Sequence, residues 1–251
     1  MSGETLKGWW LAMDTSTASM AIALFHDGRL VRESLSVSER NHSIRLVPAI
    51  RELAASCGIK VGELDGVAVG HGPGSYTGIR IAVTVAKMFA WSLDLPLIAV
   101  SSLEALAYGA ACAAEGDVWV VPLMDARRGK AYTGLYRRSG GAWRCETEDG
   151  VRDMEEWAEE LKELAGGGAE SGRRIIFAGD VRNFTPIIER LRGEWRGEVS
   201  ADEQPLSAAH VGELACMYGM ARAVGDVHRF GPNYTQLSEP EKKWLARNRS
   251  N

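Results

Sequence analysis

The chain opens with short apolar blocks, and its pattern then changes to a helical period. Trp9–Met13, Met20–His26 and Leu30–Leu35 predict three short strands, and Asp27-Gly28 between the last two is a two-residue hairpin signal. From Ser43 to Cys57 the apolar residues recur at spacings of three and four, which predicts an amphipathic helix. An antiparallel meander followed by a helix therefore begins the chain.

The remainder of the first half alternates strands with helices. Gly66–Val69 predicts a buried strand, and a glycine-rich loop leads from it into a helix at about Ile79–Leu93. Leu97–Val100 predicts a further strand. A helix over Ser102–Ala114 follows, capped by Ser101 or by the serine at its start.

The second half repeats this order without repeating the letters. Strands are predicted at Val118–Met124, Ala131–Tyr136, Ala142–Glu146 and Ile175–Ala178, and helices at Met154–Leu164 and Val181–Leu191. Nearly the same number of residues separates Asp14 from Gly70 as separates Asp125 from Gly179, and each pair closes a first and a fourth strand. We therefore predict duplicated βββαβα lobes, an α/β fold of the actin-like (ribonuclease-H-like) class in the ASKHA superfamily.

Three segments follow from this division. We predict that residues 1–101 form the first lobe, that residues 102–237 form the second, and that residues 238–251 are a charged, loosely ordered tail. A helix over Ser207–Val224 is expected to pack back across the lobes.

Composition narrows the class of protein. The 251 residues are 45% hydrophobic and 25% charged, as in an ordinary globular protein. A formal net charge of -4 argues against a broad basic surface that holds nucleic acid unaided. Four scattered cysteines, no signal-peptide pattern and no apolar run of roughly 20 residues predict a cytoplasmic chain that does not enter a membrane.

Two loops carry groups that suit a phosphate. The glycine-rich loop precedes a helix N-terminus, whose unpaired N–H groups favour an anion, and a hydroxyl-rich turn follows the first strand. The weak candidates for cofactor binding are Asp14, Thr15, Gly72, Gly74 and Ser75. The alternative is a tight strand-to-helix turn capped by Ser75 or Thr77, and the residues alone favour this alternative.

Other features argue against chemistry by this chain alone. Arg127 and Arg128 occupy the turn of the second lobe where actin-like phosphotransferases need small residues. His42 is the obvious metal ligand, but it has no partner ligand at helical spacing, so a capping or surface role is favoured. No nucleophile motif is present. We predict no catalytic residue and no metal site.

The predicted helix after the glycine loop carries a stripe of small residues at four-residue intervals, which lets another helix approach closely. Because this helix is apolar on several faces, we predict that it and the Ser43–Cys57 helix form a partner interface. The predicted interface residues are Leu46, Ile50, Gly78, Ala82, Val85, Ala86, Met88 and Phe89. Burial within its own domain is the alternative for this stripe.

Several segments together resemble the TsaB (YeaZ) family. They are Leu11–Thr17, His42-Ser43, Gly72–Arg80 with Ala86-Lys87, Val100–Ala107, Asp125–Arg128 and Pro232–Tyr234. The run Gly-Pro-Gly-Ser-Tyr-Thr-Gly-Ile-Arg is long enough to be specific, and the resemblance is strong over about Trp9–Ala107.

This resemblance implies a non-catalytic bacterial subunit that helps to place threonylcarbamoyl on the adenosine beside the tRNA anticodon. It implies pairing through first-lobe helices with a catalytic relative, TsaD, together with a P-loop ATPase, TsaE, and contact with tRNA through the complex. ATP and metal are then expected on those partner subunits, with no cofactor on this chain. A homodimer of the isolated chain is also open.

One departure and two alternatives accompany this interpretation. Lys130 stands where an acidic residue commonly follows the Asp-Ala-Arg run, which puts any partner contact there in doubt. The first alternative is an actin-like ATPase or kinase that uses Asp14 and the glycine loop. The second, a peptidase-like protein, lacks the expected nucleophile and zinc ligands.

Overall fold

Two five-stranded sheets with the same topology form the core of the computed structural model, which describes residues 6–37, 42–166 and 173–235. The strand orders are β3-β2-β1-β4-β5 and β8-β7-β6-β9-β10, with the second given from its opposite edge. In each sheet the first strand pairs antiparallel with the second and parallel with the fourth. The strands are β1 Trp9–Asp14, β2 Ser19–His26, β3 Arg29–Val37, β4 Gly66–Gly70, β5 Leu97–Val100, β6 Val118–Asp125, β7 Lys130–Ser139, β8 Ala142–Asp153, β9 Ile175–Gly179 and β10 Val199–Asp202.

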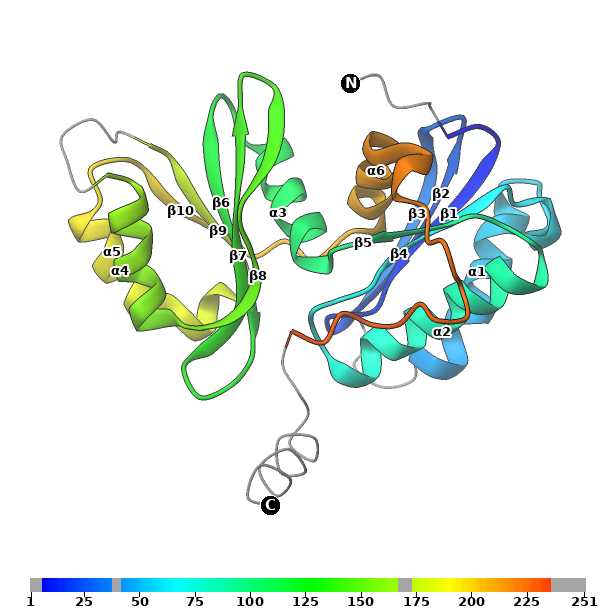
Figure 1. Cartoon of the computed structure of the whole chain (residues 1–251), viewed down its shortest axis with the longest axis horizontal. Coiled ribbons are helices and arrows are strands. Elements are labelled where there is room, and N and C mark those ends of the chain that lie inside the picture. The colour runs from blue at the N-terminus through cyan, green and yellow to red at the C-terminus, as the bar shows by residue number, and fades with distance from the viewer. Residues whose placement is uncertain (1–5, 38–41, 167–172, 236–251) are drawn as a thin grey trace, which may run out of the picture.

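The helices complete five layers, in which α1 and α2 cover the outer face of the first sheet and α4 and α5 cover the outer face of the second (Figure 1). The α-helices are α1 His42–Ser56, α2 Tyr76–Ser92, α3 Ser102–Ala113, α4 Met154–Leu164, α5 Thr185–Glu194 and α6 Ala208–Tyr218. Short 3₁₀ turns lie at Val61–Glu63, Val181–Phe184 and Gly219–Arg222. Within the described ranges, none of these helices is both long and apolar enough to cross a membrane.

The matched strand orders confirm the predicted duplication into actin-like lobes. The sequence analysis missed β10, which has only four residues. The predicted Val181–Leu191 helix is instead a 3₁₀ turn followed by α5, because Pro186 lies in the first turn of α5 and favours a new helix start there. The residues assigned to a charged tail lie outside the described ranges.

Helices α3 and α6 are exchanged between the lobes. Helix α3 follows the first sheet but packs on β6, β7 and β9, while α6 follows the second sheet but packs on β1, β2 and β3; the two helices also contact each other. The prediction that residues 102–237 form the second lobe therefore needs correction for α6, which covers the first sheet. The last predicted helix packs across the lobes as expected, but it ends at Tyr218, because Gly219 has a positive φ of 59°.

A single cluster of buried side chains fills the space between the two sheets. It includes Trp10 and Phe25 from the first sheet, Val120 from the second, Leu106 from α3 and Leu214 from α6. Two further clusters lie under α1 and α2 and under α4 and α5. The shared cluster joins the lobes through apolar burial as well as through the linking chain.

We expect Gly212→Ala to destabilise the protein, because a Cβ at this position of α6 would lie 2.1 Å from the Phe25 ring in the shared cluster. Overpacking of this kind should lower the free energy of unfolding by about 1–3 kcal/mol, measured by urea denaturation. Gly193→Ala on α5 is the matched control, since a Cβ there meets no atom within 4 Å. Equal unfolding midpoints for the two variants would contradict the tight α6 contact.

Candidate functional site

The turn after β1 is fastened by a buried carboxylate. Asp14 is 1% exposed; its Oδ1 accepts a hydrogen bond from the Ser16 backbone N–H at 2.6 Å, and its Oδ2 accepts one from Ser102 Oγ at 2.6 Å. Ser102 Oγ in turn accepts from the Gly72 N–H at 3.0 Å. A side chain at Gly70 would occupy the same space as the carboxylate. This network joins β1, the glycine loop and the start of α3.

Burial raises the pKa of Asp14, and the hydrogen bonds from Ser102 and Ser16 oppose that rise. Both carboxylate oxygens are engaged, and the neighbouring Thr15, also buried, donates its hydroxyl proton to the Gly78 carbonyl at 2.6 Å. These hydrogen bonds brace the turn after β1 against the glycine loop and the start of α3.

The glycine loop packs on the same turn. Ser75 donates its N–H to the Ser16 carbonyl at 2.7 Å, and a Cβ at Gly74 would lie 2.5 Å from that carbonyl oxygen. Ser75 Oγ accepts from the Gly78 N–H at 3.3 Å, so Ser75 is the N-cap of α2, as the turn interpretation predicted. Gly72 and Gly74 both have positive φ, at 101° and 156°. Their presence is accounted for by close packing and by this backbone conformation.

A polar cleft of about 670 Å³ opens between the lobes beside these two loops. It is lined by Ser16, Thr17, Ala18, Gly74, Ser75, Tyr76 and Thr77 from the first lobe and by Met124, Asp125, Ala126, Arg127, Tyr132, Asp180 and Asn183 from the second. Ser16 Oγ is buried and has no hydrogen-bond partner in the described part of the chain. An orphan hydroxyl, the N-terminus of α2 and Arg127 are groups that can hold an anion.

The second-lobe side of the cleft is a strained turn. Arg127 and Arg128 have consecutive positive φ values of 68° and 56°, which are costly for residues with side chains. Asp125 Oδ1 accepts from the Arg127 N–H at 2.7 Å, and its Oδ2 accepts from Asn183 at 3.2 Å. The Lys130 N–H donates to the Arg127 carbonyl at 3.2 Å, so the lysine that departs from the family pattern helps to close this turn through its backbone.

His42 is the first residue of α1 and is half-buried. It lines a second hollow beside the cleft with Thr17 and Arg127, and its Nε2 atom has no partner among the described residues. In residues 6–37, 42–166 and 173–235 no three histidine, cysteine or acidic side chains are grouped so that they could hold a metal ion.

Two half-buried acids beside the linker between the lobes were not identified from the sequence. Asp149 accepts hydrogen bonds from Ser101 and from Tyr136 Oη, and Glu104 accepts one from Trp143 Nε1 at 3.1 Å. Burial raises the pKa of both carboxyls. Only Ser101 carried a sequence signal, as the cap of α3, and it holds that position. The two acids bind the linker and α3 to strands of the second sheet.

Most of the predicted interface residues lie inside the first lobe. Leu46, Ile50, Gly78, Ala82, Ala86 and Phe89 are buried. Leu46 was predicted as an interface residue, but this side chain is 0% exposed, because α1 directs it at the sheet. A Cβ at Gly78 would lie 1.9 Å from the Thr15 carbonyl, so the small-residue stripe lets α2 approach its own sheet. These six residues cannot contact a partner while the lobe is folded.

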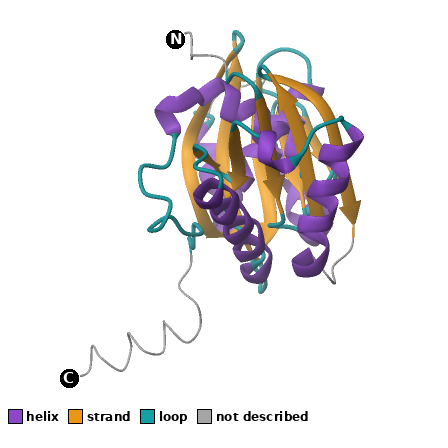
Figure 2. Cartoon of the chain, turned by 90° about the vertical axis from the view of Figure 1, so that its right-hand side faces the viewer, coloured by secondary structure: helices purple, strands orange, loops and turns teal. Residues whose placement is uncertain are grey.

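A different part of α1 and α2 is accessible. Ile44 is 69% exposed, Met88 is 41% exposed, Pro48 is exposed, and Ile81 and Val85 are half-buried. We call these five residues the outer strip; the helices that carry them lie in front of the first sheet in Figure 2. Val85 and Met88 are the predicted interface residues that keep accessible side chains.

The other flank of α2 is covered by a strap, residues 223–235, which runs along the helix (Figure 1). Lys87 Nζ donates to the carbonyls of His228 and Phe230 at 2.9 and 2.6 Å, and Arg80 Nε donates to Tyr234 Oη at 2.6 Å. One flank of α2 faces the sheet and another faces the strap, whereas the outer strip keeps exposed or half-buried side chains.

Two matched sheets, exchanged inner helices and a cleft between strand-end turns define a two-lobed protein of the actin-like class. The family described as "TsaD: tRNA N6-adenosine threonylcarbamoyltransferase" matches residues 36–189. The tRNA threonylcarbamoyladenosine biosynthesis protein TsaB of Bacillus subtilis is 38% identical over 94% of this chain and 97% of its own length. The chain belongs to the TsaB family.

Other relatives agree with this assignment. The protein of the same name from Escherichia coli is 34% identical over 62% of this chain and 67% of its own length. The structure of YeaZ from Pseudomonas aeruginosa superposes with a TM-score of 0.73 at 29% identity, covering 90% of this chain and 99% of that one. The family resemblance stated from the sequence motifs is confirmed.

We expect the stability difference between wild type and Asp14→Asn to depend on pH. The pKa of Asp14 in the folded state is raised above its ordinary value of 3.8, so ionisation at neutral pH opposes folding. As pH falls through the raised pKa, the wild type should gain stability relative to the variant. Urea unfolding of both proteins at pH 7.5 and 4.5 measures this, and a difference that stays constant would contradict the buried ionisable carboxyl.

Proposed function

We propose that this chain is a non-catalytic partner subunit in the formation of N6-threonylcarbamoyladenosine in tRNA, and that it pairs with a TsaD-like catalytic subunit. The observation that carries the proposal is the 38% identity with a TsaB protein over nearly the whole of both chains. The outer strip supports pairing, because an exposed run of apolar side chains on adjacent helices favours contact with a second protein.

The cleft supports the proposal that ATP and metal bind to other subunits of the complex. The aspartate that closes the first strand of each lobe already accepts two hydrogen bonds from its own chain, Asp14 from Ser16 and Ser102, and Asp125 from Arg127 and Asn183. A carboxylate committed in this way is a poor metal ligand without rearrangement. We therefore expect ATP and metal on the TsaD-like subunit and on a TsaE-like ATPase, and none required by this chain.

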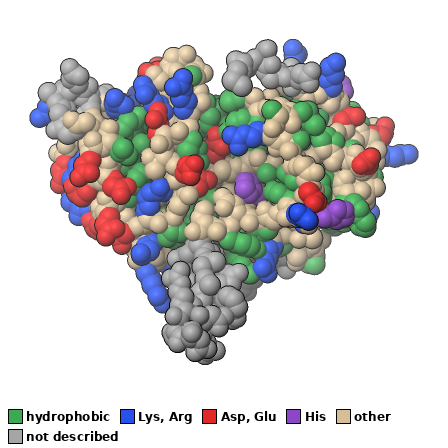
Figure 3. Space-filling view, in the orientation of Figure 1, with side chains coloured by type: hydrophobic (Ala, Val, Ile, Leu, Met, Phe, Trp, Pro, Cys, Tyr) green, Lys and Arg blue, Asp and Glu red, His purple; other side chains and the backbone are tan. Residues whose placement is uncertain are grey.

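The charge on the surface of the second lobe disfavours direct tRNA binding there. Acidic side chains gather over the second lobe, where α4 carries Glu155, Glu156, Glu159, Glu160 and Glu163, and basic side chains are dispersed over the face drawn in Figure 3. A phosphate backbone would be repelled by the α4 face. Contact with tRNA is accordingly proposed through the assembled complex.

We expect Met88→Asp to abolish association with a TsaD-like subunit, because a charge in the outer strip would be desolvated on binding. Sedimentation velocity of the mixed subunits measures the association. Formation of threonylcarbamoyladenosine in a reconstituted reaction with TsaD-like and TsaE-like proteins should fall with it.

Met217→Asp is the matched control, since Met217 is 45% exposed but lies on α6, away from the outer strip. It should retain both association and product formation. Loss of binding in both variants, or in neither, would contradict the assignment of the outer strip. Sedimentation of the isolated chain tests in parallel whether the strip also forms a homodimer.

We expect the purified chain with magnesium and ATP to show no hydrolysis above a protein-free blank, because Asp14 is engaged and Arg127 stands in the opposite turn. A coupled phosphate-release assay measures this. Turnover that disappears in Asp14→Asn would favour the alternative, an actin-like ATPase or kinase that acts alone.

A further inference from the structure

A second pocket lies at the edge of the second sheet that is remote from the cleft. The cleft is at the ends of β6 and β9, at Asp125 and next to Gly179, whereas this pocket lies where β6, β9 and β10 begin, at Val118, Ile175 and Val199. It has a volume of about 640 Å³ and is lined by Glu115, Gly116, Asp117, Val118, Trp119, Arg137, Arg173, Arg174 and Glu198. Neither the outer strip nor the cleft includes any of these residues.

The pocket contains a hydrogen-bond donor without an acceptor. Trp119 is only 6% exposed, and its indole Nε1 has no hydrogen-bond partner in the described part of the chain. An unpaired buried N–H of this kind is destabilising, and an acceptor supplied by a ligand would satisfy it. Trp195, the neighbouring indole, donates instead to the Arg173 carbonyl at 2.8 Å.

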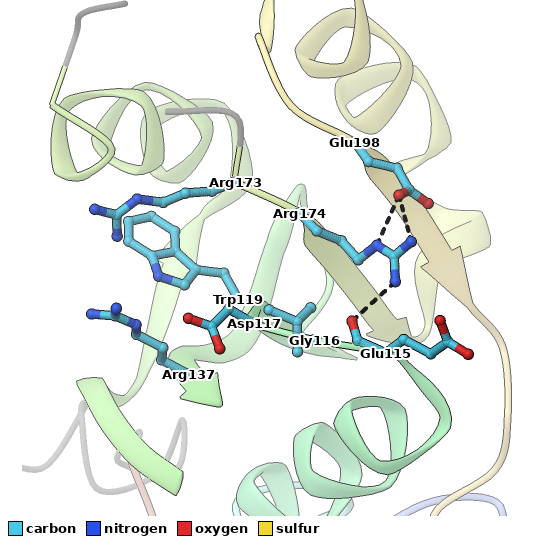
Figure 4. A pocket seen from close by; sticks show the side chains of 9 residues that line it. Glu115, Gly116, Asp117, Trp119, Arg137, Arg173, Arg174 and Glu198 are labelled. Carbon is cyan, nitrogen blue, oxygen red and sulfur yellow. Dashed lines mark hydrogen bonds and ion pairs between the residues drawn. The ribbon is translucent and has the colours of Figure 1, made fainter. Parts of the chain in front are cut away.

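Two guanidinium groups flank this indole. Arg173 lies over the Trp119 ring, 4.8 Å from its centroid, and no carboxylate of the described residues is within ion-pair distance of it. Arg137 donates to Ser139 Oγ at 3.2 Å and is 3.7 Å from Glu146. Figure 4 shows both guanidinium groups on the same side of the pocket, with the Trp119 ring between them. Both retain N–H donors for a ligand.

Arg174, the third arginine of the pocket, has its guanidinium group paired with a carboxylate. Arg174 donates to Glu198 Oε2 from Nε at 2.8 Å and from Nη2 at 2.7 Å, and it also donates to the Glu115 carbonyl at 3.3 Å. Its charge is matched by a carboxylate within the pocket. Arg174 therefore serves as an internal comparison for the two less committed arginines.

We propose that this pocket binds a phosphate group, held by the Trp119 indole N–H and the guanidinium groups of Arg137 and Arg173. An indole N–H and two guanidinium groups that line one pocket suit an oxyanion, and arginine favours phosphate through paired N–H donors. The phosphate belongs either to a free nucleotide or phosphate ion or to an RNA backbone. This inference stands independently of the proposed pairing with a TsaD-like subunit.

Acidic side chains in the pocket oppose this affinity. Glu198 is paired with Arg174, whereas Glu115 and Asp117 also line the pocket. Asp117 accepts hydrogen bonds from Ser139 Oγ and from the Gly140 N–H at 2.9 Å, and the pKa of its carboxyl is lowered by these bonds. It therefore remains ionised near Arg137 and repels an anion, so Asp117→Asn should tighten binding several-fold.

The test follows the indole N–H resonances of ¹⁵N-labelled full chain at low salt during titration with inorganic phosphate, AMP and a short single-stranded RNA. Trp119→Phe assigns the signal and removes the donor while keeping an aromatic ring. The Trp119 signal should shift saturably, whereas Trp157, a buried indole that lacks a partner but lies outside the pocket, should not move. Binding of phosphate and AMP would indicate a free ligand, and binding of RNA alone would indicate a backbone contact.

Arg173→Gln and Arg137→Gln should each weaken the apparent affinity by about tenfold, because each removes a charged donor. Arg174→Gln is the matched control and should change it less than about twofold. If Arg173→Gln does not fold, Arg173→Lys takes its place, because lysine keeps the charge but loses the paired N–H donors. A Trp119 signal unmoved by all three probes, or equal weakening in Arg174→Gln, would overturn the proposal.

Discussion

The exchange of α3 and α6 between the two sheets is the constraint on which the rest of the molecule depends. Each inner helix completes the core of the lobe that it does not follow in sequence, and the two helices touch each other. The shared cluster therefore has no counterpart in an isolated lobe. Either lobe alone would expose the apolar face of its sheet to water, so the relative position of the lobes, and with it the cleft, is set by hydrophobic burial.

The Asp14 network explains how the first-lobe side of the cleft holds its shape. Ser102 is the first residue of α3, so its hydrogen bond to Asp14 fixes the start of an exchanged helix to the end of β1. The Gly72 N–H joins the glycine loop to the same hydroxyl. Asp14 therefore ties β1, the glycine loop and an exchanged helix to one another.

Periodicity predicted the elements well, but it could not say what covers them. The order of strands and helices could be predicted in both lobes because the fourth strand of each lobe, β4 or β9, ends at a glycine. The duplication was predicted from the matched positions of Asp14 and Asp125. The stripe through Ala82 and Ala86 was assigned to a partner, yet it packs on its own lobe. Helical spacing shows that a face is buried and does not identify the surface that buries it.

The pocket beside Trp119 could not be predicted from the sequence either. Trp119, Arg137 and Arg173 come from two strands and a loop that are adjacent only after the second sheet has formed. No local motif connects them. Ser75, by contrast, was correctly interpreted because an N-cap depends on its immediate neighbours. Sequence spacing is informative for contacts within a turn, and sites assembled from distant segments need the fold.

The burial of α2 also determines what a loss of partner binding would mean. This helix is held by its own sheet on one flank and by the strap on another, so substitutions at Ala82 or Lys87 would disturb the position of Met88 without touching a partner. Buried substitutions and interface substitutions would then give the same binding defect. They differ in stability, because a core change lowers the free energy of unfolding, whereas an exposed change such as Met88→Asp should leave it nearly unaltered. Only a variant that fails to associate while keeping its unfolding midpoint identifies a residue of the outer strip as part of the interface.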